Sequence, residues 1–352
     1  MNNNKIKKIE EEIKKLKEFD YSLIEAEHSF MVNGTLGGFK SAVQKLEYTF
    51  FKQILLGIMS GVIIGFGYIA CITAMVSLPE SWNTFGIVLL GFIFPGCIIL
   101  ITFLGGGLFT SHVFSTIPVL KKCASSNAYF KGIFGVLLGN ILGTLVFVLI
   151  FAGAGGLQNI DKGSLANKVY DMAMHKLYLV TDEISTKKSI TAVSVILTIG
   201  IGICSGILCN IMVCATLPLT NSTKNPVAVF LFLIFPIAYF AIGGFQHGPA
   251  NTFFLWMMLV EIIFRPDMQF GENNISPEFI HFILFIFLST IPTLIGNWIG
   301  GAIFLPGILY LINSKYTSLL FKKMKLEYLE KQLLIKNSQL KTGENKNKKI
   351  NV

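Results

Sequence analysis

Residues 226–260 read PVAVFLFLIFPIAYFAIGGFQHGPANTFFLWMMLV, without a single Asp, Glu, Lys or Arg. A helix of about 20 apolar residues crosses the hydrocarbon core of a bilayer, so this stretch is long enough to do so. Its middle, GGFQHGPAN at 243–251, combines two glycines with a Gly-Pro pair. Such residues do not favour a continuous helix. We therefore predict two half-helices joined by a short loop with a histidine at its centre.

Five further segments also lack acidic and basic residues: 53–79, 81–120, 132–160, 189–223 and 279–314. All 29 basic and 20 acidic residues lie outside these segments and the first one. This distribution excludes a soluble globular protein, a disordered chain and a nucleic-acid-binding domain. It predicts an all-α membrane protein with six spans, at 50–77, 84–118, 127–153, 189–217, 226–263 and 279–313.

The basic residues indicate the orientation and the division into domains. On the side of the two termini, the flanks and loops carry 23 of the 29 Lys and Arg residues. The positive-inside rule then places both termini in the cytoplasm, most simply at the cell membrane. We predict a cytoplasmic tail at 1–49, a transmembrane domain at 50–313 and a basic cytoplasmic tail at 314–352.

Both tails are predicted to be partly helical. Residues 5–23 have isoleucine and leucine at helical spacing between Lys and Glu, which is typical of an amphipathic helix. After the last span, leucine recurs every seven residues from 319 to 340. This spacing allows a coiled coil between subunits, but a helix lying on the protein or the membrane is favoured. The Lys- and Asn-rich segment 341–352 is predicted to be disordered.

The second predicted span is interrupted like the fifth. It contains LGGGLFTSH at 104–112, and spans three and six share a Gly-Asn-x-x-Gly motif at 139–143 and 296–300. Close helix packing explains isolated glycines, but not two glycine clusters that each include a histidine. Three spans followed by three predict an inverted repeat, and broken helices at matching places indicate a permeation site near the midplane.

These motifs, taken together, resemble the formate/nitrite transporter family over roughly residues 50–313. Leu108-Phe109-Thr110-Ser111 is similar to the loop of its second span, and GILCNIMVC at 206–214 to the signature of its fourth. FQHGPAN at 245–251 resembles the Phe-Glu-His-x-x-Ala-Asn of its fifth span. The resemblance implies an aquaporin-like fold and a homopentamer with one pore per protomer. It also implies passage of small monovalent weak-acid anions, namely formate, nitrite, lactate, acetate or hydrosulfide.

The resemblance also implies roles for individual residues. The central transport residues are His247, Thr110, Asn210 and Asn297. The loop backbone comprises Gly105, Gly106, Gly107, Gly248 and Pro249. The constrictions are Phe94, Phe240, Leu108 and Phe109. Gln246 and Asn251 support the central histidine, and Lys176 or Lys188 attracts the anion.

The chain departs from the family pattern at three places. Gly107 stands where an acidic residue usually precedes Leu-Phe-Thr, and Gln246 replaces the usual Glu before the central histidine. Lys176 follows Ala-x-His as the family lysine does, but it lies 34 positions before Asn210, farther than usual. Lys188 is nearer, so the identity of the anion-attracting lysine stays open.

Transport chemistry follows from the lack of a counter-ion in the spans. A bare charge at the bilayer centre costs about 2.5–3.5 kcal/mol on insertion scales. Free N–H groups of a half-helix that begins at Pro249 would favour an anion. Thr110, Asn210 and Asn297 are neutral donors, and His247 has a side chain that titrates near physiological pH. We expect His247 to give a proton to the anion, which then crosses the apolar constrictions as the neutral acid. His112, just past the first loop, is not expected to face the pore.

The resulting hypothesis is a proton-linked channel or transporter whose partners are small anions, protons, lipid and further copies of the chain. No cofactor, metal or nucleic acid is expected. A pore for neutral solutes or undissociated acids is an alternative, suggested by the missing acids at 107 and 246. A non-transporting membrane scaffold that uses the helical tails is a second alternative. An enzyme is not expected, because we see no carboxylate within the spans, no metal cluster and no phosphate loop.

Overall fold

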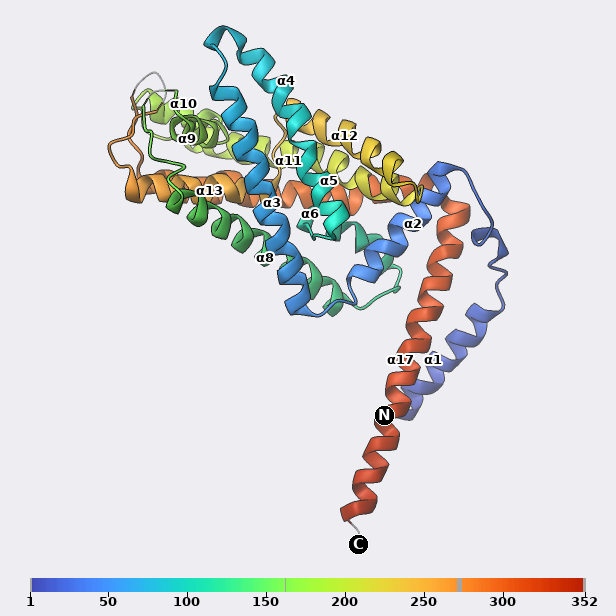
Figure 1. The fold of residues 1–352 in the computed structure, drawn as a ribbon. Helices are drawn as coiled ribbons and strands as arrows, with labels where there is room; N and C mark the ends of the chain where they lie inside the picture. The colour runs from blue at the N-terminus through green and yellow to red at the C-terminus, as the bar shows by residue number, and fades with distance from the viewer. Residues whose placement is uncertain (1, 162, 271–273, 351–352) are drawn as a thin grey trace.

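The chain is almost entirely helical. The computed structural model describes residues 2–161, 163–270 and 274–350, without the side chains of 2–5, 80 and 340–350. Most helices form one bundle, and α17 (Ser314–Ile350) extends away from it (Figure 1). Residues 341–350, which the sequence predicted to be disordered, instead continue α17 as a helix, and 351–352 lie outside the described residues.

Three spans are continuous helices: α3 (Phe50–Val76), α8 (Ser126–Gly153) and α11 (Ala192–Asn221). The second span consists of α4 (Asn83–Ile93) and α5 (Pro95–Leu104), then α6 (Phe109–His112), a 3₁₀ turn (Val113–Ser115) and α7 (Thr116–Leu120). The fifth consists of α12 (Pro226–Ile242) and α13 (Gly248–Phe264). Five of the described helical segments are long and apolar enough to cross a membrane, namely α3, α8, α11, Asn83–Leu104 and Phe279–Ile312. The two halves of span five are shorter apolar helices. The six predicted spans therefore correspond to helical segments, and both predicted breaks are present.

The two breaks have matching backbone chemistry. Gly105 ends α5 with φ +81°, and Gly244 follows α12 with φ +66°. Positive φ is readily available only to glycine, so each half-helix ends at a glycine that can adopt this conformation. Helix α13 begins at Gly248, one residue earlier than we predicted, so Pro249 is the second residue of its first turn.

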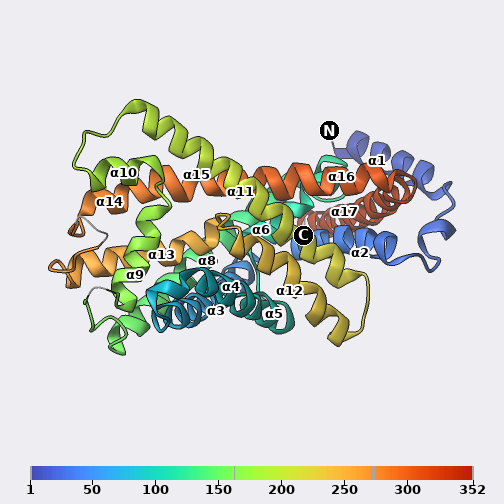
Figure 2. The ribbon, with the colours of Figure 1, turned by 90° about the horizontal axis from the view of Figure 1, so that it is seen from above.

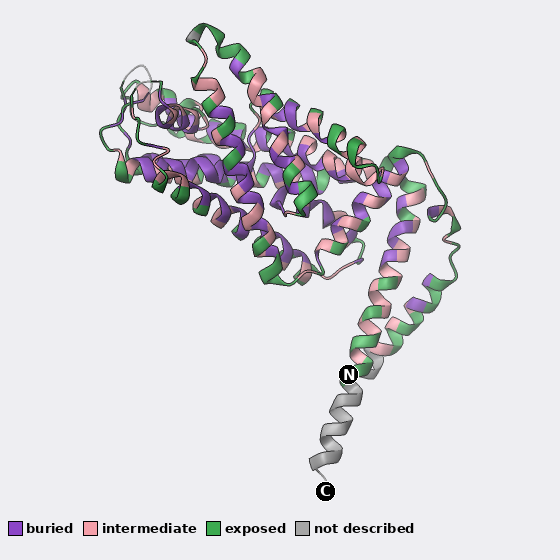
Figure 3. Ribbon diagram, in the orientation of Figure 1, coloured by how far each residue is buried: buried purple, intermediate pink, exposed green. Residues whose placement is uncertain are grey.

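Half-span α13 lies at the centre of the molecule. Its neighbours include α8 and α3 on one side and α15 (Ile291–Trp298) on the other (Figure 2). Figure 3 shows that α13 is buried along most of its length, whereas α4 and α12 expose large parts of their surfaces. In the break that precedes α13, Gln246 and His247 are buried, whereas Gly243 and Gly244 are exposed and Gly244 lines a cavity. Backbone outside a helix is tolerated within a membrane where it is buried in protein or lines such a cavity.

The Gly-Asn-x-x-Gly motifs bring spans into close contact. A Cβ added at Gly139 would lie 2.3 Å from the carbonyl oxygen of Ile54 on α3. A Cβ at Gly296 would lie 2.1 Å from the carbonyl oxygen of Ile203 on α11. Only glycine allows the backbones to approach so closely, which is the usual role of small residues between membrane helices.

Replacing Gly139 by valine is expected to destabilise the protein by about 1–3 kcal/mol, because α8 must move away from α3. Gly153→Val, at the end of the same helix, is a matched control, since nothing lies within 4 Å of a Cβ there. Thermal unfolding of the two purified variants in detergent measures the difference. Equal melting temperatures would show that the close contact contributes little.

The sixth span contains two π-helical turns that the sequence did not predict. They are η4 (Phe285–Thr290) and η5 (Ile299–Phe304), which lie between α14 (Phe279–Leu284), α15 and α16 (Leu305–Ile312). Such turns often mark functional sites, because they redirect the side chains of one helical face. Here η4 carries Ser289 toward the break in span five, as described below.

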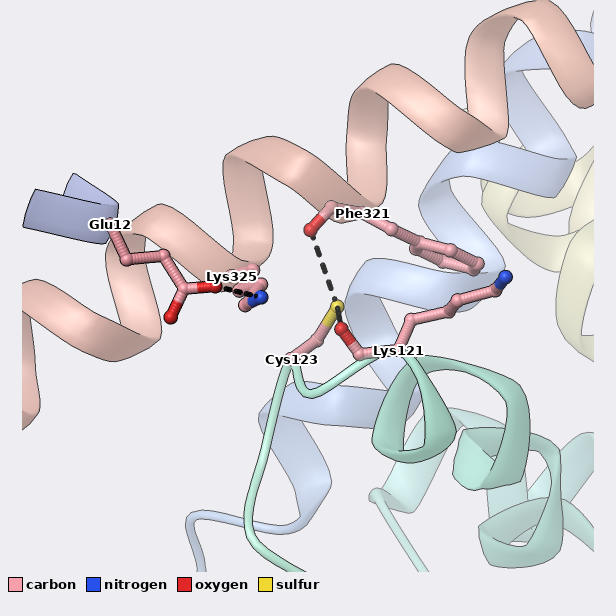
Figure 4. A network of polar contacts seen from close by, with 5 residues as sticks. All are labelled: Glu12, Lys121, Cys123, Phe321 and Lys325. Atoms are coloured by element: carbon pink, nitrogen blue, oxygen red, sulfur yellow. Dashed lines mark hydrogen bonds and ion pairs between the residues drawn. The ribbon is translucent and has the colours of Figure 1, made fainter. Parts of the chain in front are cut away.

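The tails pack on the chain itself. The amphipathic helix is α1 (Asn2–Lys17), and it lies along α17 (Figure 1), where Lys17 and Glu330 form a 2.8 Å ion pair. Lys325 of α17 also pairs with Glu12 of α1 (Figure 4). The two tail helices therefore pack on each other, and the first turns of α17 also pack on the bundle through Leu320, Phe321 and Met324. Whether the rest of α17 lies on a membrane or on another subunit stays a prediction.

The loop between spans two and three also contacts α17. The Cys123 thiol donates to the Phe321 carbonyl oxygen at 3.4 Å (Figure 4), and burial raises the pKa of this thiol to about 12. Helix α2 (Phe30–Lys45) packs against the bundle through the fully buried Phe39 and Ala42. The segment before residue 50 is thus in close contact with the predicted transmembrane domain.

Candidate permeation site

The two broken spans meet at a threonine and a histidine. Thr110 Oγ1 and His247 Nε2 share a hydrogen bond of 3.0 Å. Thr110 lies on α6, and His247 is the residue before α13. Both side chains are buried. The structure therefore brings together the two central residues that the sequence predicted 137 positions apart.

An asparagine of span three holds the first loop. Asn140 Oδ1 accepts from the backbone N–H of Phe109 at 3.1 Å. Its Nδ2 donates to the carbonyl oxygens of Gly107 at 2.9 Å and Gly57 at 3.1 Å. The Asn140 side chain thus holds the backbone on both sides of Leu108. These hydrogen-bond partners could not be predicted from the sequence motif.

Asn297, in the equivalent motif of span six, holds the second loop in the same way. Its Oδ1 accepts from the N–H of Gly248 at 2.7 Å. Its Nδ2 donates to the carbonyl oxygens of Gln246 at 3.2 Å and Gly206 at 2.8 Å. The two halves of the chain therefore make corresponding hydrogen bonds at corresponding places. Both amide hydrogens of Asn297 point to backbone oxygens in this structure.

Asn210, on α11, bridges the two halves. Its Nδ2 donates to the carbonyl oxygens of Asn297 at 2.6 Å and Thr110 at 3.3 Å, while its Oδ1 is buried without a partner. The amide N–H groups of this predicted pore asparagine are also directed at the backbone.

Gln246 is the centre of the largest polar network among the described residues of the site. Its Oε1 accepts from Asn251 Nδ2 at 2.7 Å and from the hydroxyls of Ser289 at 2.9 Å and Thr293 at 3.0 Å. Asn251 thus supports the histidine loop through Gln246, as predicted in outline. The hydroxyls were missed, because single Ser and Thr residues in an apolar helix carry no sequence signal.

The side-chain nitrogen of Gln246 binds the loop at residues 176–178. Its Nε2 donates to Tyr178 Oη at 3.0 Å and to the Lys176 carbonyl oxygen at 3.3 Å. Tyr178 has a positive φ of 48°, which non-glycine residues rarely adopt. A glutamate at position 246 could not donate to the Lys176 carbonyl oxygen, so this contact is specific to glutamine.

Aromatic side chains lie beside His247. The ring centroids of Phe94 and Phe240 are 5.8 Å apart, and that of Phe240 is 6.1 Å from the His247 ring. Tyr68, which the sequence did not single out, packs 4.8 Å from Phe94. The two predicted constriction residues of this side are therefore in contact, buried and next to the central histidine.

Leu108 and Phe109, predicted as the constriction at the first loop, are also buried. Leu108 precedes α6 and lines a cavity together with the backbone of Gly105, Gly106 and Gly107.

Two cavities of about 260 Å³ lie at opposite ends of the bundle, near α9 (Leu165–His175) and near α2 (Figure 1). We call them the Lys176 cavity and the Lys45 cavity after the lysine that lines each. The Lys176 cavity is also lined by Tyr178, Gly244 and Gln246, and the Lys45 cavity by Leu108, Ser111 and His112.

The two lysines are partly removed from water. Burial lowers the pKa of the Lys176 ammonium to about 8, and its Nζ lies 5.0 Å from the centre of the Phe254 ring. Burial also lowers the pKa of Lys45. Lys188, the other predicted candidate, is exposed in the turn after α10 (Leu179–Ser185). Lys45 was not predicted, because it is one of nine lysines in residues 1–52.

The expectation that the spans contain no carboxylate is wrong. Glu261 lies in the last turns of α13, is fully buried, and neither carboxylate oxygen has a hydrogen-bond partner. It lies 14 positions after His247, on the order of 20 Å along a helix of 1.5 Å rise per residue. Glu261 is thus remote from the central pair.

Comparison with known proteins agrees with this geometry. The sequence profile described as "Formate/nitrite transporter" matches residues 37–312. The formate channel FocA of Escherichia coli K12 is 28% identical over 264 residues, which cover 74% of this chain and 85% of FocA.

Two solved structures are similar in fold. A pentameric formate channel with formate bound has a TM-score of 0.57 at 23% identity, covering 75% of this chain and 97% of the channel. An ion channel of the FNT family has a TM-score of 0.61 at 18% identity, covering 80% of this chain and 98% of the channel. The chain therefore has the fold of these channels.

Proposed function

Because the chain belongs to the formate/nitrite transporter family, we propose that it moves small monovalent weak-acid anions, such as formate, together with protons. The observation that carries this proposal is the buried hydrogen bond between Thr110 and His247, between two cavities that each present a lysine. Among its described lining residues the Lys45 cavity has no carboxylate, whereas the Lys176 cavity includes Asp171, which contacts Lys168 and His175.

The path begins at a lysine on either side. An ammonium group attracts the anion out of water, and the anion then meets the aromatic rings of Phe94 and Phe240 or the side chain of Leu108. These apolar groups offer no replacement for the lost hydration. Passage therefore requires that the negative charge be neutralised, and His247 is the titratable group at this point of the path.

The asparagines contribute by position. The N–H groups of Asn210 and Asn297 are directed at backbone oxygens, so Thr110 and His247 are left to contact the substrate. An anion between them would replace their mutual hydrogen bond. The imidazole, protonated from water as the anion approaches, would transfer this proton to the anion and return to its neutral form. The rigid loops keep both side chains oriented for this step.

A homopentamer with one pore in each protomer is the proposed assembly. Support comes from the structural neighbour described as a pentameric formate channel and from the many apolar side chains exposed on one isolated chain. We place the pentamer in the cell membrane with both termini in the cytoplasm, on the strength of the basic flanks.

The test is a substrate panel in proteoliposomes. Formate, nitrite, lactate, acetate and hydrosulfide are supplied outside, and internal pH is recorded during uptake. We expect saturable uptake of at least one anion with simultaneous internal acidification. Uptake of glycerol or water alone, without any anion, would favour the pore for neutral solutes.

Lys176 makes a separate prediction about pH. Its ammonium is charged below a pKa of about 8, so the attraction for anions is lost as the pH on its side rises through that value. A charge pair at contact distance in water contributes about 1 kcal/mol, which is roughly a fivefold effect. Lys176→Arg keeps its charge at all these pH values and is the matched control. The ratio of wild-type to Lys176→Arg uptake should therefore fall about fivefold between pH 7 and 9, and a constant ratio would argue against Lys176 as the attracting group.

A further inference from the structure

We propose, building on the transport function above, that His112 is a proton-holding positioning residue of the Lys45 cavity. As an imidazolium, it fixes Gln53 against the end of α2; when the proton leaves, that connection opens. The inference starts from the hydrogen bonds of the ring.

Both ring nitrogens of His112 face oxygen acceptors. Nδ1 lies 3.0 Å from the Leu108 carbonyl oxygen, and Nε2 lies 2.8 Å from Oε1 of Gln53. Neither oxygen carries a hydrogen, so each contact needs an N–H on the histidine. A neutral imidazole has one N–H and an imidazolium has two. Only the charged ring satisfies both contacts.

The orientation of Gln53 is set by a third group. Its Nε2 donates to the Lys45 carbonyl oxygen at 2.6 Å. Turning the amide over would give His112 a donor, but it would place Oε1 against that carbonyl oxygen. A neutral ring therefore loses one hydrogen bond in either arrangement. If Nε2 keeps its proton, the hydrogen bond from Nδ1 to the Leu108 carbonyl oxygen is lost. If Nδ1 keeps the proton, Gln53 must turn over, and its hydrogen bond to the Lys45 carbonyl oxygen is lost.

The network joins two parts of the proposed path. Leu108 precedes α6 and is the predicted constriction of this side, whereas the half-buried Lys45 ends α2 and lines the cavity. His112 and Gln53 between them are almost completely buried, at 1% and 0% exposure. Gly107 lies beside the ring, since a Cβ there would be in van der Waals contact with His112 Cε1 at 3.4 Å. The proton on His112 thus determines whether constriction and lysine are held together.

Opposing influences act on this proton. Burial and the ammonium of Lys45 disfavour a second positive charge, while the two acceptors favour it. Tyr48 lines the same cavity, Cys214 of α11 donates to the Thr110 carbonyl oxygen, and Gly132 of α8 lies beside the ring. Among the described residues that line the cavity there is no carboxylate. The charge of His112 can therefore respond to the pH on the Lys45 side.

Solid-state NMR of the full-length protein in lipid membranes tests the protonation directly. The histidines carry ¹⁵N, and His112→Asn identifies the signals of His112. Over about pH 3 to 8, a range that extends below the usual histidine titration because burial and Lys45 disfavour the charge, we expect two protonated ring nitrogens at the acid end and one at the alkaline end. The side-chain amide signal of Gln53 should change over the same range. A single protonated nitrogen at every pH would overturn the proposal.

Two substitutions of Gln53 sharpen the test. Gln53→Glu keeps an acceptor for Nε2 and is expected to extend the doubly protonated range to higher pH. Gln53→Met removes that acceptor and should leave one protonated nitrogen at every pH. Identical His112 titrations in both variants and the wild type would show that Gln53 does not hold the proton.

The second part of the test measures formate flux while the pH is changed only on the side of the membrane that the Lys45 cavity faces. The wild type should show a step in flux that coincides with the NMR titration, and His112→Asn should lose this step. A step that persists unchanged in His112→Asn would exclude His112 as its source. Absence of any anion flux in the wild type would refute the transport function itself, whereas the NMR result stands independently.

Discussion

Replacing His247 by alanine is expected to lower proton-linked anion flux by about 60- to 300-fold. The variant offers no proton at the centre of the path, so the anion must cross as a charge. That costs about 2.5–3.5 kcal/mol on insertion scales, and each 1.4 kcal/mol corresponds to a factor of ten. Initial rates of labelled formate uptake in proteoliposomes, driven by an inward proton gradient, measure the change.

Thr110 provides the matched controls for this experiment. Thr110→Ser keeps the hydroxyl that contacts His247 Nε2 and should retain most of the flux. Thr110→Val has nearly the same shape without the hydroxyl, so it should reduce the flux. His247→Ala with full, pH-dependent uptake of every anion in the panel would refute the proton mechanism, provided that the variant forms the same oligomer as the wild type.

The membrane spans were predictable because their signals are local. Apolar segments without charges gave six spans, and the clusters around Gly105 and Gly244 gave both breaks, since glycine and proline limit the local backbone wherever they occur. The all-α membrane fold was therefore predicted correctly. The position of Pro249 was wrong by one residue, which is a typical uncertainty for the end of a helix.

The partners within the site depend on distant parts of the chain. Nothing near Asn297 in the sequence shows that its amide holds Gly248 and Gln246, and Ser289 reaches Gln246 only because a π-helical turn redirects it. Lys45 could not be distinguished from other lysines of its tail. Glu261 was overlooked although the predicted span 226–263 contains it, because the stretch without charges ends one residue before it.

The predicted roles of the central residues depend on chemistry that geometry alone does not test. The structure places His247 beside Thr110 and Phe240, as the resemblance implied, but the proton transfer remains a proposal. Lys176 rather than Lys188 lines a cavity, which favours it as the attracting lysine.

Gln246→Leu is expected to cause the largest loss of folded protein. The side chain is 1% exposed, and Asn251, Ser289 and Thr293 all donate to its Oε1. A buried group left without a partner costs about 1–3 kcal/mol, and the whole stability of a typical protein is about 5–15 kcal/mol. Asn251 keeps the Ser289 and Thr293 hydroxyls as acceptors, but these two hydroxyls lose the oxygen to which they donate. The variant should therefore lose a large part of the stability, which size-exclusion chromatography and thermal unfolding in detergent would show as a loss of the oligomer.

Gln246→Glu separates the acceptor role from the donor role. A carboxylate accepts from the same three donors, and the Tyr178 hydroxyl can donate to it instead of accepting. Only the Lys176 carbonyl oxygen then loses its donor, so the oligomer should persist and the change should be confined to the loop that carries Lys176. Loss of the oligomer in both variants would mean that the contact with Lys176, which only glutamine can make, is the essential one. Retention in both would mean that the three donors find other acceptors within the bundle, and Gln246 would then contribute little to stability.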